Sequence, residues 1–215
     1  MVEIFQDRLQ AGLLLGEKLL STKEEWEKTV VLGIPRGGAV TALGVSKKLK
    51  APLSIIVSRK LRAPGNPELG IGAVSEHGAL WLNHEIISQL GVGEEYLQAE
   101  ISFQQKRVSE YIEKFRGGLP LDLSGHDAII VDDGVATGAT IIAAAMAARK
   151  AGASRVIVAT PVIAEDVVEV VAKYCDLLVW VLKPLILYAV GMYYSNFSEV
   201  KDEEVLNILN VSHTS

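Results

Sequence analysis

Short apolar segments alternate with helix-forming segments along most of this chain, and that alternation restricts the possible folds more than any other feature. The apolar segments lack the regular polar alternation of half-exposed strands, so they predict strands buried on both faces. Such strands form a parallel sheet with helices on both sides. We therefore predict an α/β fold, with strands at residues 29–34, 52–58, 127–131, 156–160 and 177–182 and helices at residues 4–20, 39–49, 94–115, 141–150, 164–174 and 202–209.

Three other segments carry local predictions. Ser21 or Thr22, followed by acidic residues, could cap a short helix that ends at residue 28. Residues 59–70 hold two prolines and two glycines among three cations, which predicts a long mobile loop. The apolar segments 71–74 and 79–82 flank a Glu-His-Gly turn, a pattern typical of a β-hairpin.

Length and charge disfavour several classes of protein. A chain of 215 residues predicts a single domain, and no apolar run reaches the roughly 18 residues of a membrane span. A net charge of −5 disfavours nucleic-acid binding. The only cysteine is Cys175, and the first ten residues lack a secretory pattern. We expect a cytoplasmic protein with neither a nucleic-acid nor a membrane partner.

The segment AIIVDDGVATGAT, residues 128–140, carries the strongest chemical signal. An apolar strand delivers Asp132 and Asp133 at its carboxyl end, where parallel sheets bind ligands. Small and hydroxyl residues then open a helix, and their backbone N–H groups can contact a phosphate. Two carboxylates beside a phosphate make sense if they accept hydrogen bonds from sugar hydroxyls or approach a cation. The segment therefore indicates a phosphate site beside either sugar hydroxyls or a bound cation.

This segment resembles the phosphoribosyl-pyrophosphate (PRPP) signature of type I phosphoribosyltransferases. The resemblance implies that the two acids bind the ribose hydroxyls and approach Mg²⁺, in part through PRPP and water, while the following loop wraps the 5′-phosphate. Gly134 stands where the family usually has an aliphatic residue. The implied substrate-binding residues are Asp132, Asp133, Gly134, Val135, Ala136, Thr137, Gly138, Ala139 and Thr140.

Two further segments resemble the same family. Residues 34–38, Ile-Pro-Arg-Gly-Gly, resemble its pyrophosphate loop, which often contains a non-proline cis peptide. Residues 58–60, Ser-Arg-Lys, resemble the start of its flexible catalytic loop, whose cations reach the leaving pyrophosphate. The resemblance implies catalytic roles for Arg36, Arg59 and Lys60 and substrate-binding roles for Gly37 and Gly38.

The resemblance covers about residues 30–182 and implies a Rossmann-like core within one domain spanning residues 1–215. A small hood would come from residues 183–215 with N-terminal and inserted segments. The long helix 94–115 would be an insertion, and its apolar stripe predicts a homodimer interface. Segments 5–8, 65–73 and 189–197 resemble one subfamily, which implies no particular acceptor.

The implied activity is Mg²⁺-dependent transfer of the phosphoribosyl group from PRPP to a small nitrogen acceptor, with a nucleobase expected, and release of pyrophosphate. The alternative is a PRPP- or nucleotide-binding regulator without turnover, which could dispense with the loop cations. Four hood aromatics could stack on a planar acceptor or pack as a small core. We predict that at least one of them lines the acceptor pocket: Tyr188, Tyr193, Tyr194 or Phe197.

Overall fold

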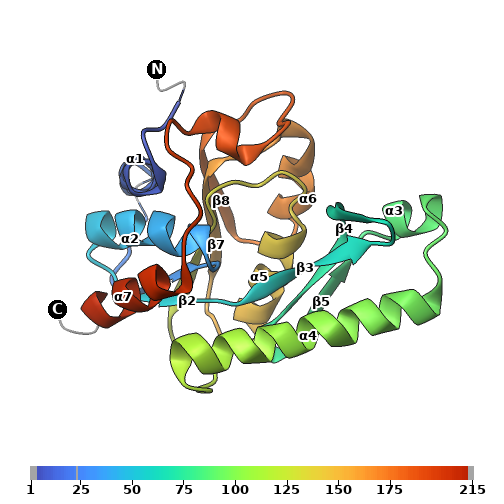
Figure 1. Cartoon of the computed structure of the whole chain (residues 1–215). Coiled ribbons are helices and arrows are strands. Elements are labelled where there is room, and N and C mark those ends of the chain that lie inside the picture. Colours follow the sequence, from blue (N-terminus) through green and yellow to red (C-terminus); the bar gives the residue numbers. More distant parts are fainter. Residues whose placement is uncertain (1–3, 23, 213–215) are drawn as a thin grey trace.

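The predicted sheet is present, and its five strands are all parallel (Figure 1). A computed structural model of the protein describes residues 4–22 and 24–212. The strands lie in the order β2, β1, β6, β7, β8. Their bounds are β1 Thr29–Gly33, β2 Leu53–Ile55, β6 Asp127–Val131, β7 Val156–Val162 and β8 Leu177–Leu182.

Successive residues of the central strands enter different apolar cores on the two faces of the sheet. Ile129 of β6 packs on one face with residues of helices 8–20, 37–49 and 202–212. Ile130 packs on the other face with residues of helices 139–150 and 168–172. This burial on both faces explains why the strands are apolar throughout. The covering helices are α1 (Arg8–Leu20), α2 (Gly37–Leu49) and α7 (Asp202–Ser212) on one face, and α5 (Ala139–Lys150) and α6 (Val168–Ala172) on the other.

The prediction of a mobile loop at residues 59–70 is wrong. Most of this segment lies in β3 (Ser58–Ala63) and β4 (Asn66–Ser75), which pair antiparallel, and β5 (Ala79–Leu82) completes a second sheet. Pro64 and Gly65 make the turn, and Pro67 falls where the strand pairing is irregular. The hairpin predicted at residues 71–82 is confirmed, with the short 3₁₀ helix η1 (Glu76–Gly78) joining its strands.

Helix α4 (Glu94–Arg116) confirms the predicted long helix and lies along the second sheet (Figure 1). Its apolar residues Ile101, Val108 and Phe115 are buried in one cluster with Leu61 and Ile71 of the hairpin. The stripe is therefore covered within the chain and gives no reason to expect a partner on this helix.

Residues 24–28 form no helix, contrary to the capping pattern. The hydroxyl of Thr22 donates to the carbonyl of Leu19 at 2.7 Å, so it closes α1 instead of opening a new helix. The strand predicted at residues 52–58 is divided between β2 and β3, because the chain passes there from the first sheet to the second.

The helix predicted at residues 164–174 is also divided, into the 3₁₀ helix η2 (Glu165–Val167) and α6. A short helix, α3 (His84–Gln89), follows β5; Asn83 caps it, and the apolar pattern did not predict it. Within residues 4–22 and 24–212, none of the helices combines the length and the apolarity that a membrane crossing requires.

The N-terminal segment around Phe5 lies beside residues 193–195. The backbone of Phe5 exchanges hydrogen bonds with Tyr193 and Ser195, both at 2.8 Å, and Phe5 forms a parallel bridge with Tyr194. We call residues 193–199 the C-terminal strap. They begin at the last residue of the 3₁₀ helix η3 (Val190–Tyr193) and run towards α7.

Candidate active site

Asp132 and Asp133, here called the acid pair, lie directly after the central strand β6. Residues 135–140, the phosphate loop, lead from the acid pair into α5. The N–H of Val135 donates to the carbonyl of Val162 at 2.9 Å, and the N–H of Ala164 donates to the carbonyl of Val135 at 3.0 Å. The loop is thus attached to the end of β7, while Ala136 and Thr137 stay exposed at its tip.

Burial raises the pKa of both acids, and for Asp132 the neighbouring charge of Asp133 raises it further. Arg8 opposes this rise at Asp133, because its Nε donates to Oδ2 of that residue at 2.7 Å. Oδ1 of Asp132 accepts the backbone N–H of Asp133 at 2.9 Å. Arg8 therefore offsets the charge of Asp133, and Asp132 accepts a hydrogen bond from the backbone.

The turn after β1, residues 35–38, lies against the acid pair. A Cβ on Gly37 would overlap Oδ2 of Asp133, and one on Gly38 would lie 2.9 Å from Oδ1 of Asp132. Two glycines are therefore needed for this close approach. The Pro35–Arg36 peptide bond is cis, as the family resemblance implies.

The side chain of Arg36 reaches the strap and α7. One of its terminal nitrogens donates to Glu199 at 2.7 Å, and the other lies 3.8 Å from Asp202. Glu199 is 74% exposed, and an exposed ion pair of this kind stabilises a fold only slightly. An anionic ligand can therefore compete for the Arg36 guanidinium, which lines a cavity of about 280 Å³ together with Arg8 and Arg59.

Strand β3 brings Arg59 and Lys60 to the same edge of the fold. The hydroxyl of Ser58 donates to the carbonyl of Thr140 at 2.8 Å, which ties the start of β3 to the first turn of α5. A cavity of about 420 Å³ borders all three segments that the sequence singled out. Its lining includes Pro35, Arg59, Lys60, Asp132 and Thr140.

Helix α4 also contributes to this cavity, through Phe103, Gln104 and Arg107. The sequence analysis missed these residues, because a helix packed beside the hairpin shows only its apolar stripe in the sequence. The guanidinium of Arg59 lies 5.3 Å from the ring centre of Tyr111 on the same helix. The cations of β3 are thus held on a packed strand.

Val190 explains why glycine, and not an aliphatic residue, stands at position 134. A Cβ on Gly134 would overlap the side chain of Val190 and lie 3.1 Å from Val162. Val190 thus occupies the space where an aliphatic side chain at position 134 would lie.

The four hood aromatics have different surroundings. Tyr194 is buried against Phe5, with ring centres 5.3 Å apart, and its hydroxyl donates to the carbonyl of Asp133 at 2.5 Å. Tyr193 packs partly into the same cluster. Phe197 stacks on Arg8, whereas the Tyr188 side chain is 80% exposed. Tyr194 therefore belongs to the core that joins the N-terminal segment to the strap.

The residues present are compatible with Mg²⁺ bound largely through a substrate. Magnesium is usually held by one or two carboxylates together with substrate phosphates and water. Asp132 lines the cavity, whereas Asp133 is engaged by Arg8. The described residues include no group of three or more His, Cys, Asp or Glu side chains that could enclose a metal ion. Asp132 is therefore the carboxylate best placed to share such an ion with PRPP.

An acid pair, a glycine turn and a phosphate loop thus meet at the carboxyl edge of a parallel sheet, where α/β folds bind ligands and a helix N-terminus favours an anion. Comparison with known proteins gives the family. The family model of the phosphoribosyl transferase domain matches residues 6–180. The chain belongs to this family, and its class is that of a transferase domain.

Two relatives describe the likeness further. A Mycobacterium tuberculosis protein named "Putative phosphoribosyl transferase Rv0571c" is 38% identical over 213 residues, which is 99% of this chain and 48% of that protein. The chain thus spans about half the length of the curated relatives it matches. The crystal structure of TT1426 from Thermus thermophilus is 39% identical, covers 96% of this chain and 97% of its own, and has a TM-score of 0.77.

Proposed function

We propose that this domain transfers the 5-phosphoribosyl group from PRPP to a nitrogen acceptor, with a nucleobase as the expected class, and releases pyrophosphate. The observation that carries the proposal is one cavity bordered by three separate segments. They are the acid pair with the phosphate loop, the turn 35–38 and the start of β3. Their sequence resemblance to one family and their convergence in space are independent observations, and they support the same substrate.

In the proposed reaction the bond between ribose C1 and a pyrophosphate oxygen breaks, and the acceptor nitrogen bonds to C1. Positive charge grows on the ribose while negative charge leaves with pyrophosphate. The site therefore needs stabilisation of the leaving anion more than it needs a nucleophile. Arg36, Arg59 and Lys60 are the cations assigned to this role, and Mg²⁺ would add further positive charge when bound.

The ribose 5-phosphate part has its own set of residues. Backbone N–H groups of residues 135–140 and the N-terminal end of α5 would bind the 5′-phosphate, because the helix dipole favours an anion there. The acid pair would accept hydrogen bonds from the ribose hydroxyls. These assignments place the phosphate and the ribose on the β6 side and the pyrophosphate near the turn 35–38.

The direct test is calorimetric titration with Mg²⁺–PRPP, followed by a screen for pyrophosphate release over nucleobases. Binding with release in the presence of one acceptor supports the transferase. Binding without release over a broad acceptor panel would favour the regulator, and absence of binding would contradict both.

We expect Lys60→Ala to lower turnover more than it lowers PRPP affinity, because a leaving-group contact strengthens as charge develops. Lys173→Ala is the matched control, since Lys173 precedes β8 and lies at the opposite edge of the sheet. Turnover and calorimetric affinity are measured for both variants. Equal losses in Lys60→Ala would mean that the cation binds substrate without acting on the leaving group.

The acceptor pocket and the assembly are also proposals. Tyr188 and Phe197 keep exposed ring surface for stacking on a base, whereas Tyr194 is buried. Tyr188→Ala should raise the acceptor KM with little effect on PRPP affinity, whereas Phe197→Ala also removes the ring that stacks on Arg8. A homodimer, which ultracentrifugation would detect, and a cytoplasmic location stay predictions.

A further inference from the structure

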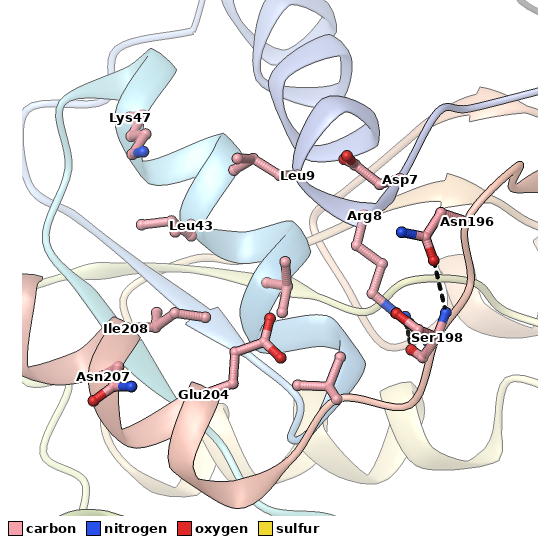
Figure 2. A pocket seen from close by; sticks show the side chains of 12 residues that line it. Asp7, Arg8, Leu9, Leu43, Lys47, Asn196, Ser198, Glu204, Asn207 and Ile208 are labelled. Carbon is pink, nitrogen blue, oxygen red and sulfur yellow. Dashed lines mark hydrogen bonds between the residues drawn. The ribbon is translucent and has the colours of Figure 1, made fainter.

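The two subfamily segments, residues 5–8 and 189–197, meet at Asp133 of the acid pair, and Arg8 has no role in the proposed reaction. Arg8 begins α1 and extends towards the strap (Figure 2). Its NH1 donates to the carbonyl of Ser198 at 2.8 Å, and its guanidinium carbon lies 3.8 Å from the ring centre of Phe197. Its Nε donates to Oδ2 of Asp133.

Asp133 is thus held by the N-terminal segment and by the strap. Arg8 fixes one carboxylate oxygen, and the hydroxyl of Tyr194 donates to the backbone carbonyl of the same residue. Gly37 lies against the Arg8–Asp133 contact, since a Cβ there would be 2.8 Å from Nε of Arg8. The Arg8 and Asp133 side chains are only 11% and 16% exposed, so the pair is well screened from water.

We propose that Arg8 is a positioning residue for the ribose site: it orients the Asp133 carboxylate and offsets its charge, so that the acid pair can bind a sugar that carries phosphates. The inference rests on the proposed function. With Oδ2 bonded to Arg8, Oδ1 of Asp133 is the oxygen that remains for a ribose hydroxyl. The positive charge also reduces the repulsion between two adjacent acids and an anionic substrate.

A residue that acts through another is recognised by a double-mutant cycle. The variants are Arg8→Gln, Asp133→Asn and their combination, and the ligands are Mg²⁺–PRPP and Mg²⁺–pyrophosphate. Arg8→Gln should weaken PRPP binding about tenfold, the usual effect of losing a charged hydrogen bond. In the Asp133→Asn background the same change should have little further effect. Pyrophosphate affinity should change much less, because pyrophosphate has no ribose.

Arg8→Lys keeps the charge and one donor, so it should restore part of the PRPP affinity. Arg155→Gln is the matched control, because Arg155 also forms ion pairs, with Glu24 and Asp127, but away from the site. Melting temperatures of all variants identify any that fail to fold, in which case Arg8→Lys carries the test.

Additive losses in the cycle, or equal losses for PRPP and pyrophosphate, would overturn the positioning role and leave Arg8 as an anion contact or a structural tie. A wild-type protein that does not bind Mg²⁺–PRPP would overturn the proposed function and the inference together. Wild-type binding with an additive cycle would overturn the inference alone.

Discussion

Gly37 shows how much one missing side chain contributes to the site. We expect Gly37→Ala to weaken PRPP binding about tenfold or more, because the new Cβ must displace the Asp133 carboxylate or the turn. Gly93→Ala is the control, since a Cβ there meets no atom within 4 Å. Calorimetry on both variants checks the result. An unchanged affinity in Gly37→Ala would show that the turn can retreat from the acid pair at little cost.

A side chain at position 134 would occupy space that Val190 fills, so a smaller residue at position 190 should compensate for a larger one at position 134. Gly134→Ala forces its Cβ into the Val190 side chain, and overpacking of this kind costs about 1–3 kcal/mol. Adding Val190→Ala should recover most of the loss. Urea unfolding of the two single variants and the double variant measures the coupling; independent, additive effects would mean that the two residues do not compete for space.

At the scale of elements, the β3–β4 hairpin is held to α4 by Glu100. Its Oε1 accepts from Nε of Arg62 at 2.9 Å and from the Gln104 amide at 2.9 Å. Burial pushes the pKa of Glu100 up, but these hydrogen bonds outweigh burial and leave the pKa lowered. The interaction therefore stabilises the ionised form and fixes the strand that carries Arg59 and Lys60.

We expect Glu100→Gln to cost about 2 kcal/mol of unfolding free energy at pH 7. A lowered pKa means that the stabilisation is complete above the ordinary Glu value. It is lost as the pH falls from the ordinary Glu pKa, about 4.3, through the lower pKa of the folded state. The difference between variant and wild type should therefore shrink in acid, as urea unfolding across pH would show.

The matched control for Glu100 is on the same helix. Glu110 pairs with Arg107 at 2.9 Å, and both side chains are 43% exposed. Glu110→Gln should change the free energy of unfolding by less than about 1 kcal/mol at any pH. If both variants lost the same free energy, the hairpin would not depend on the buried carboxylate.

The hairpin also marks where prediction from sequence failed. Parallel strands buried on both faces are visible as apolar runs, so the five-stranded sheet and the position of Asp132 after β6 could be predicted. Arg59, Lys60 and Arg62 are polar because they line a cavity or pair with α4, and the prolines fall at the turn and an irregular pairing. A strand with those residues has the composition of a loop.

Contacts between segments far apart in the sequence could not be predicted either. Arg8 and Asp133 are 125 positions apart, and no local pattern marks Arg8 as part of the acid-pair environment. The subfamily resemblance singled out residues 5–8 and 189–197 but gave them no role. Only the folded chain shows that both segments reach the same aspartate.

At the scale of the whole molecule, the packing of the N-terminal segment against the strap supports the site. We expect Phe5→Ala to cost about 3–5 kcal/mol, because Phe5 is fully buried against Tyr194. PRPP affinity should fall as well, since the strap that holds Arg8 loses its packing. Leu90→Ala, at a residue 47% exposed after α3, is the control. A loss of stability with normal PRPP affinity would separate this packing from the site.

Synthesis on the ribosome separates Arg8 and Ser198 in time. The two residues are 190 positions apart, and at about 5–20 residues per second Arg8 is made roughly 10–40 s before its partner. The sheet can assemble once β8 has emerged, but Asp133 gains both of its supports only when the strap follows. A chain that has not yet reached the strap therefore lacks both the Tyr194 hydrogen bond to Asp133 and the Ser198 hydrogen bond to Arg8.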